Sequence, residues 1–190
     1  MHTKSGLRIE YREKRNNLSK ELFSIQSQNI VKLFSDLDCK NPGTVLTYAP
    51  LSNQQEFDPT PCTYCLQTQY PDIILSWPKT EIKGFGMDAF GAESLQLFKP
   101  NSWGILEPSN GQLIDPLALD LVLVPLLAFD TRGYRVGYGK GFYDRFFARC
   151  RKNVLKIGFS FFEPVVKIED IDQFDVPLSH CITPSGIYEF

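Results

Sequence analysis

The chain has 190 residues, of which 43% are hydrophobic and 22% are charged, and its formal net charge is −2. These proportions are typical of a globular protein and exclude a disordered chain. A charge so close to neutral gives no general attraction to nucleic acid or to an anionic membrane, so any anion site must be local.

The first part of the chain predicts two helices and a strand. Residues 3–16 read as one helix and residues 19–36 as a second, with Ser19 as its N-cap and apolar residues along one side. Residues 44–49 (TVLTYA) are rich in β-branched and aromatic side chains, which predicts a buried strand.

The middle of the chain is more broken. A helix is expected through residues 62–70, followed by a short buried strand over 72–77 that Pro78 ends. Glycines and prolines punctuate residues 80–118, where only short strands such as 94–98 (SLQLF) are expected.

The last part of the chain supplies the clearest central strand, over residues 117–125, because its centre is an uninterrupted apolar run. A helix over 142–150, a strand over 154–160 and one more short strand near residue 182 follow. Strands that alternate with helices predict an α/β protein with a mostly parallel central sheet. Ligands of such sheets bind beyond the carboxyl ends of the strands.

A glycine run follows that central strand. Gly137, Gly139 and Gly141 alternate with other residues, and Arg135 and Lys140 add two basic side chains to the same stretch. Glycine permits a positive φ and close approach of the backbone to a ligand, so successive N–H groups can face one anion. If a helix begins near Gly141, its first N–H groups add a positive dipole end.

The run is neither of the two common nucleotide motifs. Lys140 is followed by Gly141 rather than by Ser or Thr, which excludes the P-loop, and the third glycine comes one residue too early for the dinucleotide fingerprint. A phosphate cradle and a tight turn between strand and helix both fit the glycines. The flanking charges favour the cradle.

Two aspartates near the run have alternative roles. Asp144 either caps the first helical turn or holds a hydrated Mg²⁺ beside a phosphate. Asp130 begins a turn of the Asx type or contributes a carboxylate at the end of the strand.

The first helix carries four basic residues that fall within about 80° of one another at 3.6 residues per turn. They recur at i, i+4, i+8 and i+11: Lys4, Arg8, Arg12 and Arg15. A solvated charged face, a nucleic-acid-binding arm and an anion stripe over a nucleotide's phosphates are the alternatives.

Other residues have default structural interpretations. Tyr48, Trp77, Phe85 and Trp103 are core aromatics unless a planar ligand binds there, and Glu56 is a solvated loop carboxylate. The five cysteines are scattered and odd in number, which favours reduced thiols; the C-x-x-C pair at 62–65 has no second pair to complete a zinc site.

The expected location of the protein in the cell depends on two kinds of apolar segment. Residues 1–17 hold no apolar secretion segment, and no apolar run reaches the roughly 20 residues that span a bilayer. We therefore expect a cytoplasmic protein without a membrane partner.

Several segments together resemble the 5-formyltetrahydrofolate cyclo-ligase family, over nearly the full chain. They are Lys4-x-x-x-Arg8, YAPLSNQQEFDPTP (48–61), WGILEP (103–108) and DLVLVPLLAFDTRGYRVGYGKGFYDRF (120–146). The resemblance implies ATP-dependent closure of 5-formyltetrahydrofolate to 5,10-methenyltetrahydrofolate, with release of ADP and phosphate and with Mg²⁺ as cofactor. It also implies one monomeric cyclo-ligase domain over residues 1–190, with a three-layer α/β/α fold like that of sugar-phosphate isomerases and CoA transferases.

The resemblance also assigns site residues. Those expected to contact ATP are Lys4, Ser5, Gly6, Leu7, Arg8, Arg135, Val136, Gly137, Tyr138, Gly139, Lys140, Gly141, Phe142 and Tyr143. Lys140 and Arg135 are the expected catalytic residues, which neutralise the transferring phosphoryl group. Leu51, Glu56 and Trp103 are expected to contact the folate, and Asp144 and Asp175 the metal.

The C-terminal part departs from the family pattern. Phe174 precedes Asp175 where the family often has histidine, and Ser179 and Pro184 replace common acidic residues. These departures keep one alternative open, a binding protein of the same fold without turnover. A second alternative is an enzyme of another class that shares the sheet, such as a sugar-phosphate isomerase. An RNA-binding protein that uses the basic helix is a third alternative.

Overall fold

The structure is a computed structural model that describes residues 2–51, 54–81, 84, 86–92 and 98–190. Its helices are α1 (Lys4–Asn16), α2 (Lys20–Ser35), α3 (Thr60–Gln69) and α4 (Phe142–Phe147), with a 3₁₀ helix over Pro116–Ala118. Its strands are β1 (Thr44–Leu46), β2 (Ile74–Glu81), β3 (Gly86–Gly91), β4 (Phe98–Pro100), β5 (Leu106–Pro108), β6 (Gln112–Ile114), β7 (Leu121–Val124), β8 (Ala128–Phe129), β9 (Arg135–Val136), β10 (Leu155–Phe159), β11 (His180–Thr183) and β12 (Gly186–Glu189).

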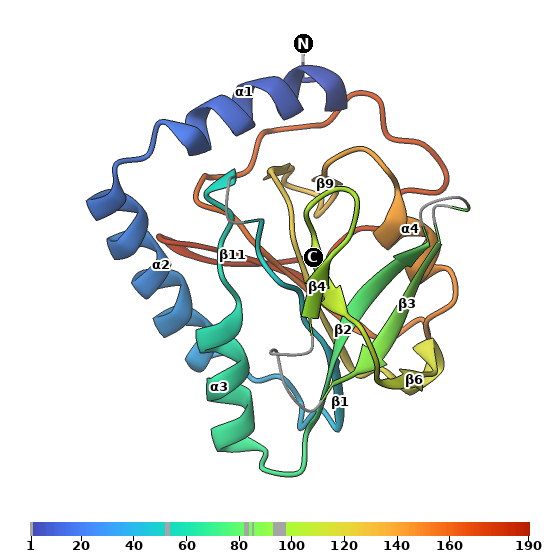
Figure 1. The fold of residues 1–190 in the computed structure, drawn as a ribbon. Coiled ribbons are helices and arrows are strands. Elements are labelled where there is room, and N and C mark those ends of the chain that lie inside the picture. The colour runs from blue at the N-terminus through green and yellow to red at the C-terminus, as the bar shows by residue number, and fades with distance from the viewer. Residues whose placement is uncertain (1, 52–53, 82–83, 85, 93–97) are drawn as a thin grey trace.

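Eight strands form one sheet in the order β12-β11-β10-β7-β1-β2-β3-β6. Every pairing from β11 to β2 is parallel, whereas β12, β3 and β6 join through antiparallel pairings. The expected mostly parallel α/β sheet is confirmed. Figure 1 shows the strands between α2 and α3 on one side and α4 on the other, with α1 across one end of the sheet.

Strand β7 shows why the sheet is covered on both faces. Its four residues are all fully buried. Leu121 and Leu123 pack with side chains of α2 and α3, whereas Val122 and Val124 pack with those of α4. Because successive side chains of a strand point to opposite faces, one apolar run serves two cores. Each such side chain contributes about 1.5–3 kcal/mol by its burial.

The order of the strands creates a topological switch point. From β1 the chain crosses through α3 to β2 on one side, whereas from β7 it crosses through α4 to β10 on the other side. Strands β1 and β7 are themselves parallel neighbours. Connections that leave in opposite directions open a crevice at the carboxyl ends of these two strands, where ligands of α/β sheets bind.

A third apolar cluster attaches α1 to this end of the sheet. Leu7 and Tyr11 of α1 pack against residues of the β8–β9 hairpin such as Ala128 and Val136. Thr3 is the N-cap of α1, because its side-chain oxygen accepts a hydrogen bond from the Gly6 N–H at 3.2 Å. This packing holds the basic helix beside the glycine run.

Asp130 has the structural role of a turn residue. It is fully buried, and its Oδ1 accepts hydrogen bonds from the N–H groups of Arg132 (3.0 Å) and Tyr134 (3.1 Å). Its Oδ2 accepts from the Arg132 guanidinium (2.6 Å) and from the Ile168 N–H (3.0 Å). The carboxylate therefore ties the hairpin to the segment before the C-terminal strands.

Several predicted boundaries were wrong. Pro78 does not end its strand: β2 runs from Ile74 to Glu81, and its pairing with β1 stops at Ser76, so Pro78 removes no hydrogen bond from that ladder. The strand expected over 117–125 is confined to 121–124, because the residues before it form the 3₁₀ helix.

Other boundaries also moved. The helix expected over 142–150 ends at Phe147, and the strand expected over 44–49 ends at Leu46. The strand near residue 182 is confirmed as β11, and the antiparallel β12 beyond it was not expected. Most of the strand expected over 94–98, and Phe85, lie outside the described residues.

Within the described part of the chain, no helix combines the length and the apolar character that crossing a membrane requires. The five cysteines, all in that part, carry free thiols.

Candidate active site

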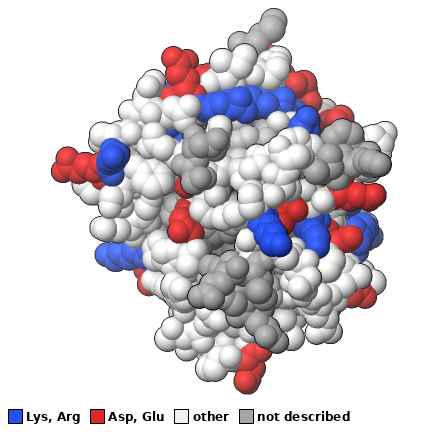
Figure 2. All heavy atoms as spheres, viewed as in Figure 1, with Lys and Arg blue, Asp and Glu red and all other residues white. Residues whose placement is uncertain are grey.

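A cleft of about 920 Å³ opens at the switch point. Residues just beyond the ends of β1 and β7, such as Tyr48, Ala49 and Pro125, form its floor. Its walls come from α1, the glycine run, the start of α4 and the segment 172–176. Figure 2 shows a row of Lys and Arg side chains across the part of this face where α1 lies.

Most of the predicted site residues line this one cleft. They are Lys4, Arg8, Leu51, Glu56, Trp103, Arg135, Gly137, Tyr138, Gly139, Lys140, Gly141, Phe142, Tyr143, Asp144 and Asp175. Leu7 and Val136 lie instead in the apolar cluster under α1, each 1% exposed. Ser5 and Gly6 lie on the exposed side of α1 and are not among the lining residues.

The glycine run has the backbone that only glycine adopts readily. Gly139 has φ 91°, and Gly141, which precedes α4, has φ 67°. The Arg8 Nε donates to the Gly137 carbonyl oxygen at 2.9 Å, and a Cβ on Gly139 would come within 3.1 Å of that guanidinium. The run is therefore a sharp turn pressed against a cation of α1, so the two interpretations of the glycines are compatible.

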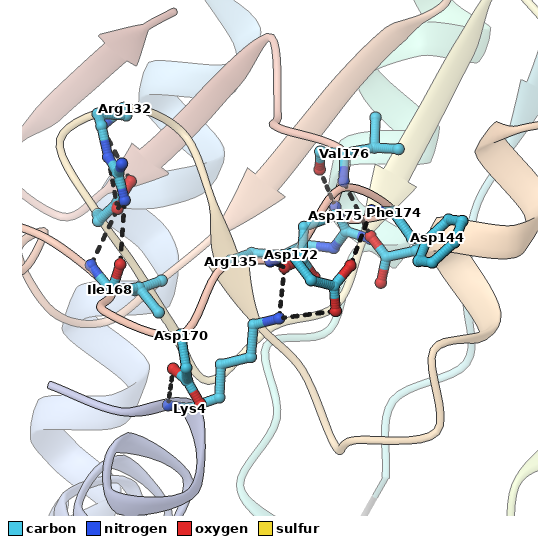
Figure 3. A network of polar contacts seen from close by, with 11 residues as sticks. Lys4, Arg132, Arg135, Asp144, Ile168, Asp170, Asp172, Phe174, Asp175 and Val176 are labelled. Atoms are coloured by element: carbon cyan, nitrogen blue, oxygen red, sulfur yellow. Dashed lines mark hydrogen bonds and ion pairs between the residues drawn. The ribbon is translucent and has the colours of Figure 1, made fainter.

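The segment 170–176 contacts α1 through an ion pair, and it contacts a second ion pair, between β9 and α4, through its backbone. Lys4 Nζ forms a short ion pair with Asp175, and Arg135 donates to Asp144 Oδ1 at 2.8 Å. Arg135 also donates to the Val176 carbonyl oxygen at 2.5 Å, while the Val176 N–H donates to Asp144 Oδ1 at 3.2 Å. Figure 3 shows these contacts converging from three parts of the chain.

Burial acts on the charge of Arg135. Its side chain is 6% exposed, and desolvation lowers the pKa of the guanidinium, while the charge of Asp144 and the hydrogen bond to it raise this pKa. Lys4 and Arg135 are both neutralised by carboxylates in the structure. An incoming phosphate would have to share these cations with Asp175 and Asp144.

The chemistry of the carboxylates fits a metal that is shared with a ligand. In the described part of the chain, no group of three or more His, Cys, Asp or Glu side chains is placed to hold an ion. Mg²⁺ commonly binds proteins through one or two carboxylates plus substrate phosphates and water. Asp144 lines the cleft with 26% of its side chain exposed, so it suits such a shared site.

An aromatic wall of the cleft lies next to the glycine run. The rings of Trp103 and Phe142 lie 5.6 Å apart, and the Lys140 ammonium lies 5.9 Å from the Trp103 ring. Trp103 is 37% exposed and faces the cleft, so it offers a flat surface to a planar ligand.

The loop that carries Trp103 is held by a polar cluster that was not predicted from the sequence. Asn101 Oδ1 accepts from the N–H groups of Trp103 (2.9 Å) and Ile105 (3.1 Å), and the Asn101 amide donates to Glu107 at 2.9 Å. Glu107, 7% exposed, also accepts from the Thr80 hydroxyl at 2.6 Å. The WGILEP motif contained this signal, because a Glu in a strand next to a cleft needs partners.

The default interpretation of Glu56 as a solvated loop carboxylate was wrong. It is 6% exposed, and it accepts from the Leu51 N–H at 2.8 Å and from the Tyr138 hydroxyl at 2.6 Å. Burial raises its pKa, against the opposing effects of these two hydrogen bonds and of the Arg15 charge.

The basic stripe of the first helix does not act as one surface. Lys4 and Arg8 line the cleft, whereas Arg12 is exposed and is not among the lining residues. Arg15 is 3% exposed and donates to the Tyr138 hydroxyl at 2.7 Å. The alternative of a four-residue anion stripe does not fit the structure, because the packing of α1 on the hairpin buries its last basic residue.

The departures from the family pattern have separate places. Phe174 lines the cleft with 72% of its surface exposed. Ser179 is structural, since its hydroxyl accepts from the Lys156 N–H at 3.1 Å. Pro184 lies in the turn between β11 and β12.

The fold and the cleft define an α/β protein with a ligand site at the switch point, where cations face an aromatic wall. The sequence model of the 5-formyltetrahydrofolate cyclo-ligase family matches residues 1–184, and the chain belongs to this family.

Individual relatives agree with this assignment over shorter segments. A probable 5-formyltetrahydrofolate cyclo-ligase of Schizosaccharomyces pombe is 32% identical over 102 residues, which cover 46% of this chain and 50% of the relative. The Haemophilus influenzae 5-formyltetrahydrofolate cyclo-ligase is 40% identical over 83 residues, 42% of this chain and 44% of the relative. The aligned segments thus span half or less of these relatives.

Solved structures match over nearly the whole chain. The NMR structure of Aquifex aeolicus 5,10-methenyltetrahydrofolate synthetase superposes with a TM-score of 0.78 at 29% identity and covers 98% of this chain and 92% of its own. The Mycoplasma pneumoniae 5,10-methenyltetrahydrofolate synthetase has a TM-score of 0.74 at 24% identity, with coverage of 95% and 98%, and shows the shared fold.

Proposed function

We propose that this protein uses ATP to close 5-formyltetrahydrofolate into 5,10-methenyltetrahydrofolate, with release of ADP and phosphate. The observation that carries the proposal is the single cleft in which α1, the glycine run and the aromatic wall meet, in a chain that belongs to the cyclo-ligase family. The cationic side of the cleft suits a triphosphate, and the aromatic side with Glu56 suits a pteridine.

The proposed reaction has two steps. The formyl oxygen attacks the γ-phosphorus of ATP, and ADP leaves. N10 then attacks the formyl carbon, loses its proton, and the phosphate departs with the former formyl oxygen. Such a reaction asks the protein to position two ligands and to neutralise charge on the transferring phosphoryl group.

Charged groups of the cleft have the corresponding roles in the proposal. Lys4 and Arg8 hold the phosphates from α1, while Arg135 and Lys140 neutralise the transferring group, each worth roughly 2–4 kcal/mol in the transition state. Asp144 and Asp175 would hold Mg²⁺, which supplies charge neutralisation to the phosphates when it is bound. The backbone of the glycine run presents N–H groups to the same phosphates.

The folate side of the cleft binds the second substrate in the proposal. Glu56 accepts hydrogen bonds from the pteridine N–H groups, Trp103 lies against its ring system, and Leu51 completes the wall. A monomeric single domain, a cytoplasmic location and the absence of nucleic-acid binding stay predictions.

The test is incubation of the purified protein with ATP, Mg²⁺ and 5-formyltetrahydrofolate while the absorbance of the methenyl product is followed. We expect product only when both substrates are present. Lys140→Ala should lower kcat by about 10²–10³-fold, as the loss of one donor to a transition-state charge does. Wild-type turnover in Lys140→Ala would remove the role given to this lysine, and binding of both substrates without product would favour the non-catalytic alternative.

A further inference from the structure

Tyr138 belongs to the glycine run, yet its hydroxyl group contacts the folate side of the cleft. The residue stands between Gly137 and Gly139, whose backbone turns against Arg8. The Tyr138 hydroxyl donates to Glu56 Oε1 at 2.6 Å. These two residues are 82 positions apart in sequence, so the contact joins the loop after β9 to the loop after β1.

Arg15 fixes the direction of that hydrogen bond. Its guanidinium donates to the Tyr138 oxygen at 2.7 Å. A phenol has one proton, and a guanidinium can only donate, so the Tyr138 proton is left for the Glu56 carboxylate. Arg15 is 3% exposed and Glu56 is 6% exposed, so the two ends of the chain of hydrogen bonds from Arg15 through the half-buried Tyr138 to Glu56 are buried.

Glu56 keeps acceptor capacity for a ligand. The Leu51 N–H donates to Oε2 at 2.8 Å, and Tyr138 donates to Oε1. A carboxylate offers about four acceptor positions on its two oxygens, so two further donors can be bound. Because the carboxylate lines the cleft, those positions are available to the N–H groups of a ligand there.

We propose that Tyr138 is a positioning residue for the folate, which holds Glu56 through its hydroxyl group and thereby couples the nucleotide loop to the folate site. The proposal rests on the proposed function, since it takes the glycine run as the phosphate site and Glu56 as a folate ligand. Phosphates that fix the glycine run also fix Tyr138, so nucleotide strengthens folate binding, and folate strengthens nucleotide binding by the same factor.

The test variant is Tyr138→Phe, which removes one hydroxyl and keeps the ring. A hydrogen bond to a charged group is worth about a tenfold or greater change in affinity, so we expect the Kd and the KM for 5-formyltetrahydrofolate to rise about tenfold. The kcat at saturating folate should change by less than about threefold, because Tyr138 touches no reacting atom. The factor by which ATP strengthens folate binding should fall towards one.

The pH dependence of folate affinity distinguishes a positioning role of Tyr138 from a general loss of structure in the variant. The groups that face Glu56 are Arg15 from α1, Tyr138 from the glycine run, Tyr48 beyond β1 and Tyr143 from α4. The Tyr138 hydrogen bond lowers the pKa of Glu56, so its removal raises that pKa. The acid limb of folate affinity should therefore move to higher pH in Tyr138→Phe.

Tyr11→Phe is the matched control. Tyr11 is a buried tyrosine of α1 in the apolar cluster against which Tyr138 also packs. The centroid of its ring lies 5.5 Å from that of Phe162. Its variant should keep the wild-type folate affinity, coupling factor and pH limb.

Equilibrium titration of wild-type protein with 5-formyltetrahydrofolate, with and without ATP, is the measurement that comes first. If the wild type binds no folate, the proposed function fails and this inference fails with it. If the wild type binds folate and Tyr138→Phe matches it in affinity, coupling and pH limb, only the inference on Tyr138 is overturned. An equal loss in Tyr11→Phe would also overturn it, because the effect would then be one of packing.

Discussion

At the scale of the residue, Glu56 shows how a site residue can oppose stability. A carboxylate that is 6% exposed binds a ligand's N–H groups strongly, because water does not compete. The same burial raises its pKa, so the folded protein favours the protonated form. Ligand binding therefore requires the ionised form of Glu56, whereas the stability of the fold favours the protonated form.

This opposition predicts how Glu56→Gln behaves. Since the folded pKa lies above the unfolded one, ionised Glu56 costs the wild type stability as pH rises from the ordinary carboxyl range, about 4.3, through the raised value. Glutamine does not titrate, so the free energy of unfolding of the wild type should fall relative to that of Glu56→Gln over this window. Urea unfolding at a series of pH values measures the difference. If the free energy of unfolding of the wild type stayed constant or rose relative to that of Glu56→Gln over this window, the result would contradict the account.

Residue patterns predicted the site only in part. The glycines, Lys140 and Asp144 are close in sequence and could be grouped from it. Asp175 and Lys4 are 171 positions apart, and nothing in either neighbourhood indicates that they form an ion pair. The burial of Arg15 could not be predicted either. Helical periodicity assigns a residue to one side of the helix, but it does not show which part of the chain packs on that side.

At the scale of the element, the glycine run is a turn whose backbone restricts substitution. Gly139 has φ 91° and lies against Arg8, whereas Gly137 has no positive φ and a Cβ there would meet nothing within 4 Å. Gly139→Ala should lower the free energy of unfolding by about 1–3 kcal/mol, the usual cost of a non-glycine residue in this region. Gly137→Ala should cost less, since its Cβ fits.

Thermal or urea unfolding of the two variants provides the comparison. The same Cβ presses on the Arg8 guanidinium, so Gly139→Ala should also raise the KM for ATP. Equal stability of the two alanine variants would contradict the view that the positive φ matters.

The elements themselves were predicted unevenly. Strand β7 and helix α2 follow from their apolar patterns and from the Ser19 cap, which accepts from the Leu22 N–H at 3.1 Å. The antiparallel strands β3 and β6 were missed, because they lie in a stretch where glycines and prolines mask any period. Strand β3 pairs with β2 from Ser76 to Glu81, so this pairing depends on the continuation of β2 past Pro78. Strand β6 joins the sheet through β3.

At the scale of the whole molecule, the cleft depends on parts that are distant in sequence. Helix α1, the loops after β1 and β9, and the segment 172–176 all contribute to it. A ligand that contacts all of these parts should stabilise the whole native state, since it binds the folded chain and not the unfolded chain.

This view predicts a large thermal shift. At about 100 times its Kd, a ligand adds about 2.7 kcal/mol, which corresponds to roughly 5–10 °C in Tm for a chain of this size. We expect shifts of this order with ATP plus Mg²⁺ and with 5-formyltetrahydrofolate, measured by calorimetry. A sugar phosphate is the control; if it alone shifted Tm, the isomerase-like alternative would be favoured.

The most direct test of the central claim follows ADP and methenyl product in one reaction. If phosphorylation of the formyl oxygen drives ring closure, one ADP must appear for each 5,10-methenyltetrahydrofolate formed. We predict equal amounts at every time point, and neither product when one substrate is omitted. ADP without methenyl product, or methenyl product without ADP, would contradict the proposed reaction.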